Sequence, residues 1–390
     1  TADEIREEYY ILLSLAALGA CVLVASNHFA SMFIGLELMS VSLFAMVGYM
    51  AHSQQQTNMT LEAGVKYMVL SGVSSSFLLF GVALIYAYAG NLTIDLAISA
   101  DGPRLQSGYL VVGSALLLVG VAFKMSWIPF HMWTPDVYQG APAPVTSFLA
   151  GGVKVAVFAF AMRWLMMAQG DYLKLLLLGL TVMAVLSMVV GNLMALRQNN
   201  LKRLLGYSSI AHMGYVIITL AASATHGAAA LSTALEGAAI YLITYASMTM
   251  LAFAVISQLA AQDRRFESGT LSHYAGLLFQ QPLLAGALIL SMLALAGMPL
   301  TAGFIGKYYL VLVAVESQLW LLLSLLVLGS ALGLYYYLRV ILVLCKAPID
   351  DQEMSFGVGE KLLLLLLVLM TLWLGLYPTP VIEWVQLAIA

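Results

Sequence analysis

Eleven long apolar runs constrain the fold of this 390-residue chain more than any other feature of its sequence. A helix needs roughly 20 mostly apolar residues, at 1.5 Å rise each, to cross the ~30 Å hydrocarbon core of a bilayer. The runs are continuously apolar rather than alternating, which excludes a transmembrane barrel. The sequence therefore predicts an all-α membrane protein, a polytopic helical bundle, with spans at 9–26, 29–51, 62–89, 108–128, 144–168, 173–196, 201–223, 231–260, 283–316, 319–345 and 361–377.

The composition excludes several classes of protein. Hydrophobic residues make up 62% of the chain, charged residues 9%, and the mean hydropathy is +0.95, which excludes a soluble globular enzyme. Sixteen Lys and Arg stand against nineteen Asp and Glu without a basic stripe, so nucleic acid is not a partner. Cys21 and Cys345 are far apart in apolar runs, which suggests neither a disulfide framework nor a thiolate metal site. The six histidines lack metal-ligand spacing, and no dinucleotide, haem or flavin motif is present, so we expect no cofactor in this chain.

The start of the chain and its undivided apolar character bear on domain organisation. Residues 1–8 are acidic and lack a positively charged n-region, so they are no signal peptide, and we expect the true start to precede Thr1. No linker is long or polar enough to separate two domains. A single transmembrane domain over 1–390 is therefore predicted.

Two of the spans contain proline interruptions. One lies at 124–129, and the other, at 296–303, splits a run of some thirty apolar residues. Proline removes a backbone donor and clashes with the preceding turn, so both helices should break or kink there. Broken helices five spans apart also suggest a duplicated five-helix unit, with ordinary proline kinks as the alternative. For His131, directly after the first interruption, a loop cap and a gating role both stay open.

The distribution of Lys and Arg predicts the orientation. If the eleven spans alternate, the side that holds the N-terminus carries most of the basic residues: Arg6, Arg197, Lys202, Arg203, Arg264, Arg265, Lys346 and Lys361. The other side offers Arg104, Lys174 and the helix-end Arg163. By the positive-inside rule the N-terminal side faces the cytoplasm, and the C-terminus lies on the far side.

Charged residues within the spans are the most informative ones: Glu37, Lys66, Lys124, Lys154 and Lys307. A charge at the bilayer centre costs on the order of 3 kcal/mol by insertion scales. One glutamate cannot pair with four lysines. The excess lysines must be neutral for part of the time or lie in a hydrated path, and both conditions suit proton transfer.

These residues differ in their predicted depth within the membrane. Lys154 lies about 15 Å inside the membrane at 1.5 Å per residue, His212 reaches a similar depth, and Glu37 lies roughly 12 Å from the outer edge. Lys66 is shallower and follows Glu62 at i,i+4, so a surface ion pair and a proton-uptake role both stay open.

Each deep residue also has a structural interpretation. Lys154 and Lys124 could be lysines that extend from a helix end to the interface. Glu37 could be a buried glutamate with a hydrogen bond to a neighbouring helix, and His212 a helix-packing donor. The aromatic run 335–337 is interpreted as lipid-facing or interfacial.

Four motifs, in order along essentially the whole chain, carry a resemblance to a known family. They are IGLELMS around Glu37, FKMSWIPFHMWTPDVYQGAPAPVT at 123–146, NNLKRLLGYSSIAHMGY at 199–215 and AGMPLTAGFIGKYY at 296–309. Together they resemble the proton-translocating, antiporter-like membrane subunits of respiratory complex I. Lysine at position 307 favours the N-type subunits among these.

The resemblance implies a particular architecture. That family has fourteen helices, of which helices four to eight and nine to thirteen form inverted repeats, so the eleven spans would be the last eleven. Residues 1–168 would form the first repeat, 169–345 the second and 346–390 a C-terminal helix. The two interrupted spans would be the discontinuous helices seven and twelve, facing a central hydrophilic axis in a bacterial inner membrane.

The resemblance also implies functional roles for eight residues: Glu37, Glu62, Lys66, Lys124, His131, Lys154, His212 and Lys307. Glu37 and Lys124 would form the carboxylate–lysine pair of the family, and Lys154 would match the central lysine of helix eight. Glu62 and Lys66 would lie near the cytoplasmic side. Protons would pass laterally from the Glu37–Lys124 pair through Lys154 and His212 to Lys307.

The implied function is proton conduction coupled to NADH:quinone electron transfer elsewhere in the complex. Other membrane-arm subunits and the lipid bilayer would be the partners, and flavin, iron–sulfur clusters and quinone would belong to other subunits. Three alternatives stay open. A subunit of a cation/proton antiporter would show sodium-dependent transport, a non-conducting scaffold would tolerate neutralisation of Lys154, and a quinone-binding enzyme would need a cavity that the sequence does not identify.

Overall fold

The computed structural model describes residues 4–49, 54–95, 107–168, 171–224, 228–347 and 357–389. In these ranges the chain is helical apart from turns and two isolated β-bridges, which join His28 to Thr93 and Asn200 to Thr270. Ten helices of the described chain are long and apolar enough to cross a membrane. The predicted all-α membrane fold is confirmed.

The helices match the predicted spans closely. Ten of the eleven predicted spans each have a counterpart among these ten long helices. The eleventh, 283–316, is divided into α13 (Pro282–Ala296) and α14 (Ala302–Glu316), each of 15 residues. The break predicted at 296–303 is therefore confirmed.

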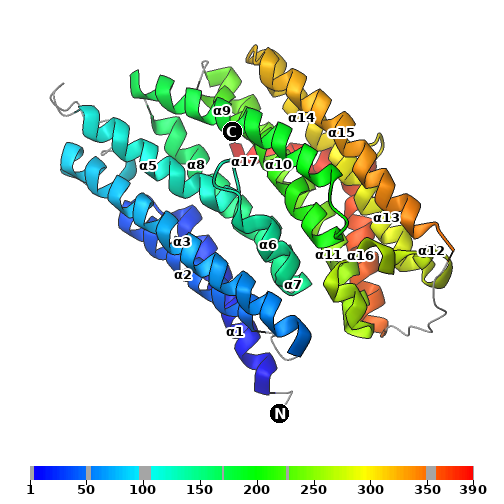
Figure 1. Cartoon of the computed structure of the whole chain (residues 1–390). Helices are drawn as coiled ribbons and strands as arrows, with labels where there is room; N and C mark the ends of the chain where they lie inside the picture. Colours follow the sequence, from blue (N-terminus) through cyan, green and yellow to red (C-terminus); the bar gives the residue numbers. More distant parts are fainter. Residues whose placement is uncertain are drawn as a thin grey trace. The chain divides into compact units, whose positions relative to one another are not determined.

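The chain folds into two compact units. The first comprises Thr1–Ala141 and Gly152–Met183. Its helices are α1 (Glu4–Ala25), α2 (Phe29–Gly48), α3 (Gln54–Ala89), α5 (Ser107–Met125), α6 (Trp133–Gly140), α8 (Lys154–Met167) and the start of α9 (Asp171–Leu196). In Figure 1, α2, α3 and α5 are the long helices in blue and cyan.

The second unit comprises Pro142–Gly151 and Ala184–Ala390. A π-helix, Leu149–Val153, continues directly from α7 and leads into α8. The helices of this unit are α7 (Ala143–Phe148), the rest of α9, α10 (Leu201–Ser223), α11 (Ala228–Gln262), the 3-10 helices Arg264–Ser268 and Leu271–Tyr274, α12 (Leu277–Gln280), α13, α14, α15 (Trp320–Leu344), α16 (Val358–Leu376) and α17 (Thr379–Ile389).

Small residues set the close helix contacts of the first unit. A Cβ atom on Gly81 of α3 would lie 2.6 Å from the Gly113 carbonyl oxygen of α5, and one on Gly113 would lie 2.7 Å from the Gly81 oxygen. Gly19 and Gly35 face each other in the same way where α1 crosses α2. In lipid there is little hydrophobic drive between helices, so this backbone approach supplies the packing energy.

Helix α10 forms the core of the second unit. Almost every residue from Leu201 to Ser223 is buried, and α11, α14 and α15 pack against it. Such complete burial is unusual for a helix that carries serine, tyrosine, lysine and histidine, because each buried polar group needs a partner.

The first break lies between α5 and α6. Helix α5 ends at Met125, Ser126 adopts a left-handed φ of 63°, the Ile128–Pro129 bond is cis, and α6 begins at Trp133. The indole Nε1 of Trp133 donates to the Phe123 carbonyl oxygen at 2.8 Å. The same carbonyl accepts from the Ser126 amide at 3.0 Å, so the indole is a second donor where α5 ends.

The close approach of α3 and α5 gives a direct test. Gly81→Ala should destabilise the protein by about 1–3 kcal/mol, because the added methyl would overlap the α5 backbone. Gly72→Ala on the same helix should be neutral or stabilising, since nothing lies within 4 Å of its Cβ position and alanine favours helix. The thermal unfolding midpoint in mild detergent measures both, and equal midpoints would contradict the packing assignment.

Candidate functional site

Lys124 occupies a buried polar site in the first unit. Its side chain is 2% exposed in the last turn of α5, and Nζ donates to the Ser40 and Ser71 hydroxyls, both at 2.6 Å. The Ser40 hydroxyl in turn donates to the Leu36 carbonyl at 2.6 Å, which leaves its oxygen lone pairs free to accept from the lysine. Helices α2 and α3 thus each supply one acceptor to the amine.

Glu37, the predicted partner of Lys124, and Lys124 itself each bond a different serine of α3. In the described structure Glu37 forms no ion pair with Lys124 within 4.0 Å; its carboxylate accepts from the Ser75 hydroxyl instead. Ser75 and Ser71 lie one turn apart on α3, so the two charged groups share one short polar stripe.

Aromatic rings enclose the rest of the Lys124 amine. Nζ lies 5.7 Å from the Tyr67 ring centroid, 5.9 Å from that of Phe123 and 6.0 Å from that of Phe44. Trp133 of α6 stacks on both Tyr67, at 4.8 Å, and Phe123, at 5.4 Å. The aromatic enclosure, defined by these four rings, stabilises a cation and limits access of water.

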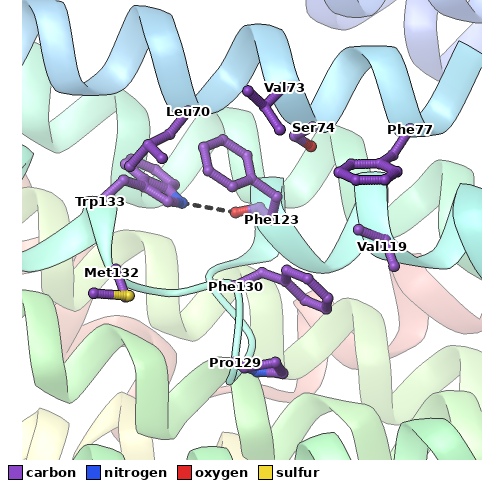
Figure 2. A pocket seen from close by; sticks show the side chains of 10 residues that line it. All are labelled: Leu70, Val73, Ser74, Phe77, Val119, Phe123, Pro129, Phe130, Met132 and Trp133. Atoms are coloured by element: carbon purple, nitrogen blue, oxygen red, sulfur yellow. Dashed lines mark hydrogen bonds between the residues drawn. The ribbon is translucent and has the colours of Figure 1, made fainter.

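An apolar cavity of about 280 Å³ adjoins this enclosure. Figure 2 shows Phe123 and Trp133 on one side of it, with their hydrogen bond dashed, and Phe77 and Phe130 around it. The hydroxyl of Ser74, which also lines the cavity, is buried without a hydrogen-bond partner in the described structure. The rings of Phe123 and Trp133 therefore have open space beside them.

Lys66 is shared by two carboxylates. Its Nζ lies 2.6 Å from Glu62 Oε1, one turn earlier on α3, and 2.9 Å from Asp136 Oδ2 on α6. The Lys66 side chain is 43% exposed and that of Asp136 is 29% exposed. The Glu62–Lys66 pair was predicted from the sequence, but the contact to α6 was not.

Lys154 lies near the middle of the span Ala143–Met167 and is 1% exposed. It directly follows the π-helix Leu149–Val153, a distortion often found at functional positions. Its Nζ lies 5.7 Å from the centroid of the buried Tyr138 ring on α6. Depth and burial agree with the predicted central position and exclude a lysine that reaches the interface.

His212, in the middle of α10, lies between two phenols. Its Nδ1 is 2.7 Å from the Tyr241 hydroxyl of α11, and its Nε2 is 3.2 Å from the Tyr337 hydroxyl of α15. A neutral imidazole has one donor and one acceptor nitrogen, and hydroxyls at both positions can serve either tautomer or the cation. The site therefore accommodates every protonation state of the ring.

The hydroxyl network around His212 extends to α9. Tyr336 donates to Asn192 Oδ1 at 3.1 Å, and Asn192 Nδ2 donates to the Tyr215 hydroxyl at 2.8 Å. Tyr336 and Tyr337 are each 1% exposed, so their interpretation as lipid-facing or interfacial residues is wrong. Of the residues 335–337, only Tyr335, which is 64% exposed, agrees with the lipid-facing interpretation. Adjacent residues of a helix point about 100° apart, so the three rings cannot all face the same way.

Lys307 caps the end of α13 at the second break. Its Nζ donates to the carbonyl oxygens of Ala296, at 2.8 Å, and Leu295, at 3.3 Å, in the last turn of α13. A cation there meets the negative end of the helix dipole. Gly297 has a φ of 83°, and a Cβ on it would lie 2.8 Å from Lys307 Cδ, so both the turn and the lysine require glycine. The Lys307 amine also lies 5.8 Å from the Tyr215 ring centroid.

His131 stands apart from this set. In the described structure its side chain forms no hydrogen bond or ion pair with any other candidate residue, while its carbonyl accepts from the Thr134 amide at 2.9 Å as α6 begins. Burial lowers the pKa of His131, and a hydrogen bond with the Pro129 backbone opposes that shift. Its side-chain Nδ1 is buried without a hydrogen-bond partner in the described structure, so the loop-cap and gating interpretations both stay predictions.

Sequence reasoning missed several buried polar groups. Lys202 was counted only among the basic residues of the N-terminal side, yet it is 1% exposed at the start of α10 and its Nζ lies 3.4 Å from the Glu267 carbonyl. Asp136, Tyr138 and Tyr241 were not singled out. Asp136 and Tyr138 lie within the 123–146 motif, whose polar residues after Pro129 were the available signal.

The fold and the site together define a polytopic membrane protein with lysines buried beside two helix breaks and in the middle of a span. The family profile described as NADH:quinone oxidoreductase/Mrp antiporter, transmembrane, matches residues 26–333. The chain is 45% identical over 392 residues to NADH-quinone oxidoreductase subunit N of Ectopseudomonas mendocina (strain ymp), covering 98% of this chain and 76% of the relative.

Solved structures agree with this match. A chain of respiratory complex I from Thermus thermophilus with bound aureothin is 35% identical, with a TM-score of 0.81 over 96% of this chain and 79% of that one. A chain of an archaeal membrane-bound sulfane sulfur reductase is 29% identical, with a TM-score of 0.86 over 98% and 75%. A chain of the Mrp complex from Dietzia sp. DQ12-45-1b, at 20% identity and a TM-score of 0.84, shares the fold.

The chain therefore belongs to the NADH:quinone oxidoreductase/Mrp antiporter transmembrane family, and its motifs and its 45% identical relative place it with the N-type subunits. The resemblance predicted from the motifs is confirmed.

The serines around Lys124 give a second prediction. Ser71→Ala should destabilise the protein by about 1–3 kcal/mol, because a buried amine loses one of its two hydroxyl acceptors. Ser76→Ala is the control, since that exposed hydroxyl on the same helix bonds only the Gly72 carbonyl of its own helix. Thermal unfolding in detergent should separate the two variants, and an equally stable Ser71→Ala protein would argue against the acceptor role.

Proposed function

We propose that this chain is a proton-translocating membrane subunit of an NADH:quinone oxidoreductase. The observation that carries the proposal is the burial of three lysines, Lys124, Lys154 and Lys307, in a chain whose described part has ten helices long and apolar enough to cross a membrane. Lysine is costly there when charged, so a purely structural role would select an apolar side chain of similar volume.

The surroundings of the lysines suit a change of protonation state. Hydroxyls hold Lys124 and backbone carbonyls hold Lys307, and these acceptors bind an ammonium or a neutral amine. A nearby carboxylate favours the charged form and desolvation the neutral form, so a small displacement of Glu37 relative to Lys124 changes which form prevails. Each lysine can then accept a proton in one state and release it in another.

Two stretches of a path follow from the contacts. In the first unit we propose proton uptake at Glu62 and Lys66, transfer to the Glu37–Lys124 site and onward to Lys154. In the second unit His212, with its tyrosines, and Lys307 form the corresponding stretch, while His131 supports the break. We also propose that residues 1–168 and 169–345 are the two inverted repeats.

The proposal includes partners and orientation. The relatives named above are parts of multi-subunit respiratory assemblies, which supports association of this chain with other membrane-arm subunits. Redox chemistry is assigned to flavin, iron–sulfur and quinone sites of other subunits. The excess of Lys and Arg on one side supports a cytoplasmic N-terminus and a periplasmic C-terminus in a bacterial inner membrane.

Lys154 gives the main functional test. Lys154→Arg keeps the charge and the donors but cannot deprotonate at accessible pH, so the complex should assemble and lose most of its pumping, about tenfold. A structural lysine predicts the reverse order, with arginine active and Lys154→Met poorly assembled. Proton translocation in proteoliposomes, with assembly measured separately, decides between them. An arginine variant that pumps at the native rate would falsify the relay role.

Lys307 gives an independent test. Lys307→Met should lower translocation about tenfold, while Lys307→Arg should be tolerated in part, because arginine still caps the α13 carbonyls but holds its proton. Lys174→Met, at an exposed lysine, is the control. Native pumping by Lys307→Met would remove this residue from the path, and pumping that requires sodium would favour a cation/proton antiporter.

A further inference from the structure

We propose that Asp136 is a positioning residue that ties α6 to α3 and thereby sets the surroundings of Lys124 and Lys154. The inference rests on the proposed function, because it assigns a role within the same proton path. It starts from one bond: Asp136 Oδ2 on α6 accepts from Lys66 Nζ on α3 at 2.9 Å.

The position of Asp136 on α6 makes this bond a tie between helices. Residues of an α-helix are about 100° apart, so Trp133, Asp136 and Gly140 share one face. That face meets α3: Trp133 stacks on Tyr67, and the Thr60 hydroxyl donates to the Gly140 carbonyl at 3.1 Å. Of these contacts the ion pair is the one that a single proton can remove.

The same face borders the Lys124 site. Trp133 completes the aromatic enclosure of that lysine and holds the end of α5 through the Phe123 carbonyl. A shift of α6 therefore moves Trp133 relative to Tyr67 and Phe123, whose rings both lie under the Lys124 amine.

The opposite face of α6 borders the Lys154 site. Tyr138 is two residues from Asp136, about 200° around the helix. Its buried ring lies 5.7 Å from Lys154 Nζ. One eight-residue helix thus contacts Lys66 directly, encloses Lys124 and faces Lys154.

The structure leaves room for α6 to move. Helix α6 begins after an interruption and does not continue α5, so no main-chain helical hydrogen bonds run from α5 into it. The cavity of about 280 Å³ lies beside Trp133, the ring that such a movement displaces, and beside Phe123 of α5, on which Trp133 stacks (Figure 2).

The charges of the triad Glu62, Lys66 and Asp136 explain how a proton could release α6. Within the part of the chain that the structure describes, Lys66 forms ion pairs with both Glu62 and Asp136, so these three side chains together carry one excess negative charge, which favours binding of a proton. A proton on Asp136 breaks the tie and leaves Lys66 paired with Glu62. Loss of the proton restores the tie, so uptake at this triad changes the position of α6 and with it both lysine sites.

The test compares three variants in the assembled complex. Asp136→Asn should lower the protons translocated per NADH oxidised about fivefold, and Asp136→Glu should restore most of that ratio, because it retains the charge that holds the tie. Glu62→Gln removes an equal charge from the same lysine without releasing α6, so its loss should be smaller. Equal losses in Asp136→Asn and Glu62→Gln would overturn the tie in favour of a simple charge effect.

A second readout does not depend on pumping. Amide hydrogen exchange in the 133–140 segment should be several times faster in Asp136→Asn than in the native complex and near native in Asp136→Glu. Unchanged exchange in Asp136→Asn would contradict the inference. Asp95→Asn, at an exposed residue of the same unit, is the charge control.

The inference and the proposed function can fail separately. Native pumping by Lys154→Met would overturn the proposed function. Loss of pumping in Lys154→Met with native pumping in Asp136→Asn would overturn only the role of Asp136.

Discussion

The burial of lysine amines among hydroxyls, carbonyls and rings is the interaction on which the rest of this structure depends. Each amine would cost several kcal/mol in lipid without these partners. The break before α14 leaves the Leu295 and Ala296 carbonyls for Lys307, since a continuous helix uses its own carbonyls. Lys124 instead takes serine hydroxyls of α2 and α3 as its acceptors. Irregular backbone therefore supplies the acceptors of Lys307.

The two units meet this requirement differently. In the first, serines of α2 and α3 hold Lys124, and their dipoles can rotate as the charge changes. In the second, the fixed carbonyls of α13 hold Lys307, and His212 sits in a tyrosine network on a wholly buried helix. An adaptable set of acceptors in the first unit and a fixed set in the second give the lysines different responses to a moving charge.

The sequence predicted the helices well because a membrane span depends mainly on one property, the length of its apolar run. It also predicted both breaks from proline and glycine, and it identified the buried charges by their cost. It could not show that Glu37 and Lys124 bond separate serines of α3, or that Tyr336 and Tyr337 face inward while Tyr335 faces out. Those features depend on helix rotation and on contacts between segments distant in sequence, such as Lys66 with Asp136.

The central claim is that buried lysines change protonation state during turnover. Infrared difference spectra of the assembled complex, with nitrogen-15 lysine, measure this directly when NADH is added under turnover conditions. We expect isotope-shifted ammonium bands that appear in the native complex and are diminished in Lys154→Arg. Spectra without any lysine-dependent bands, from a complex that pumps protons at the same time, would contradict the claim.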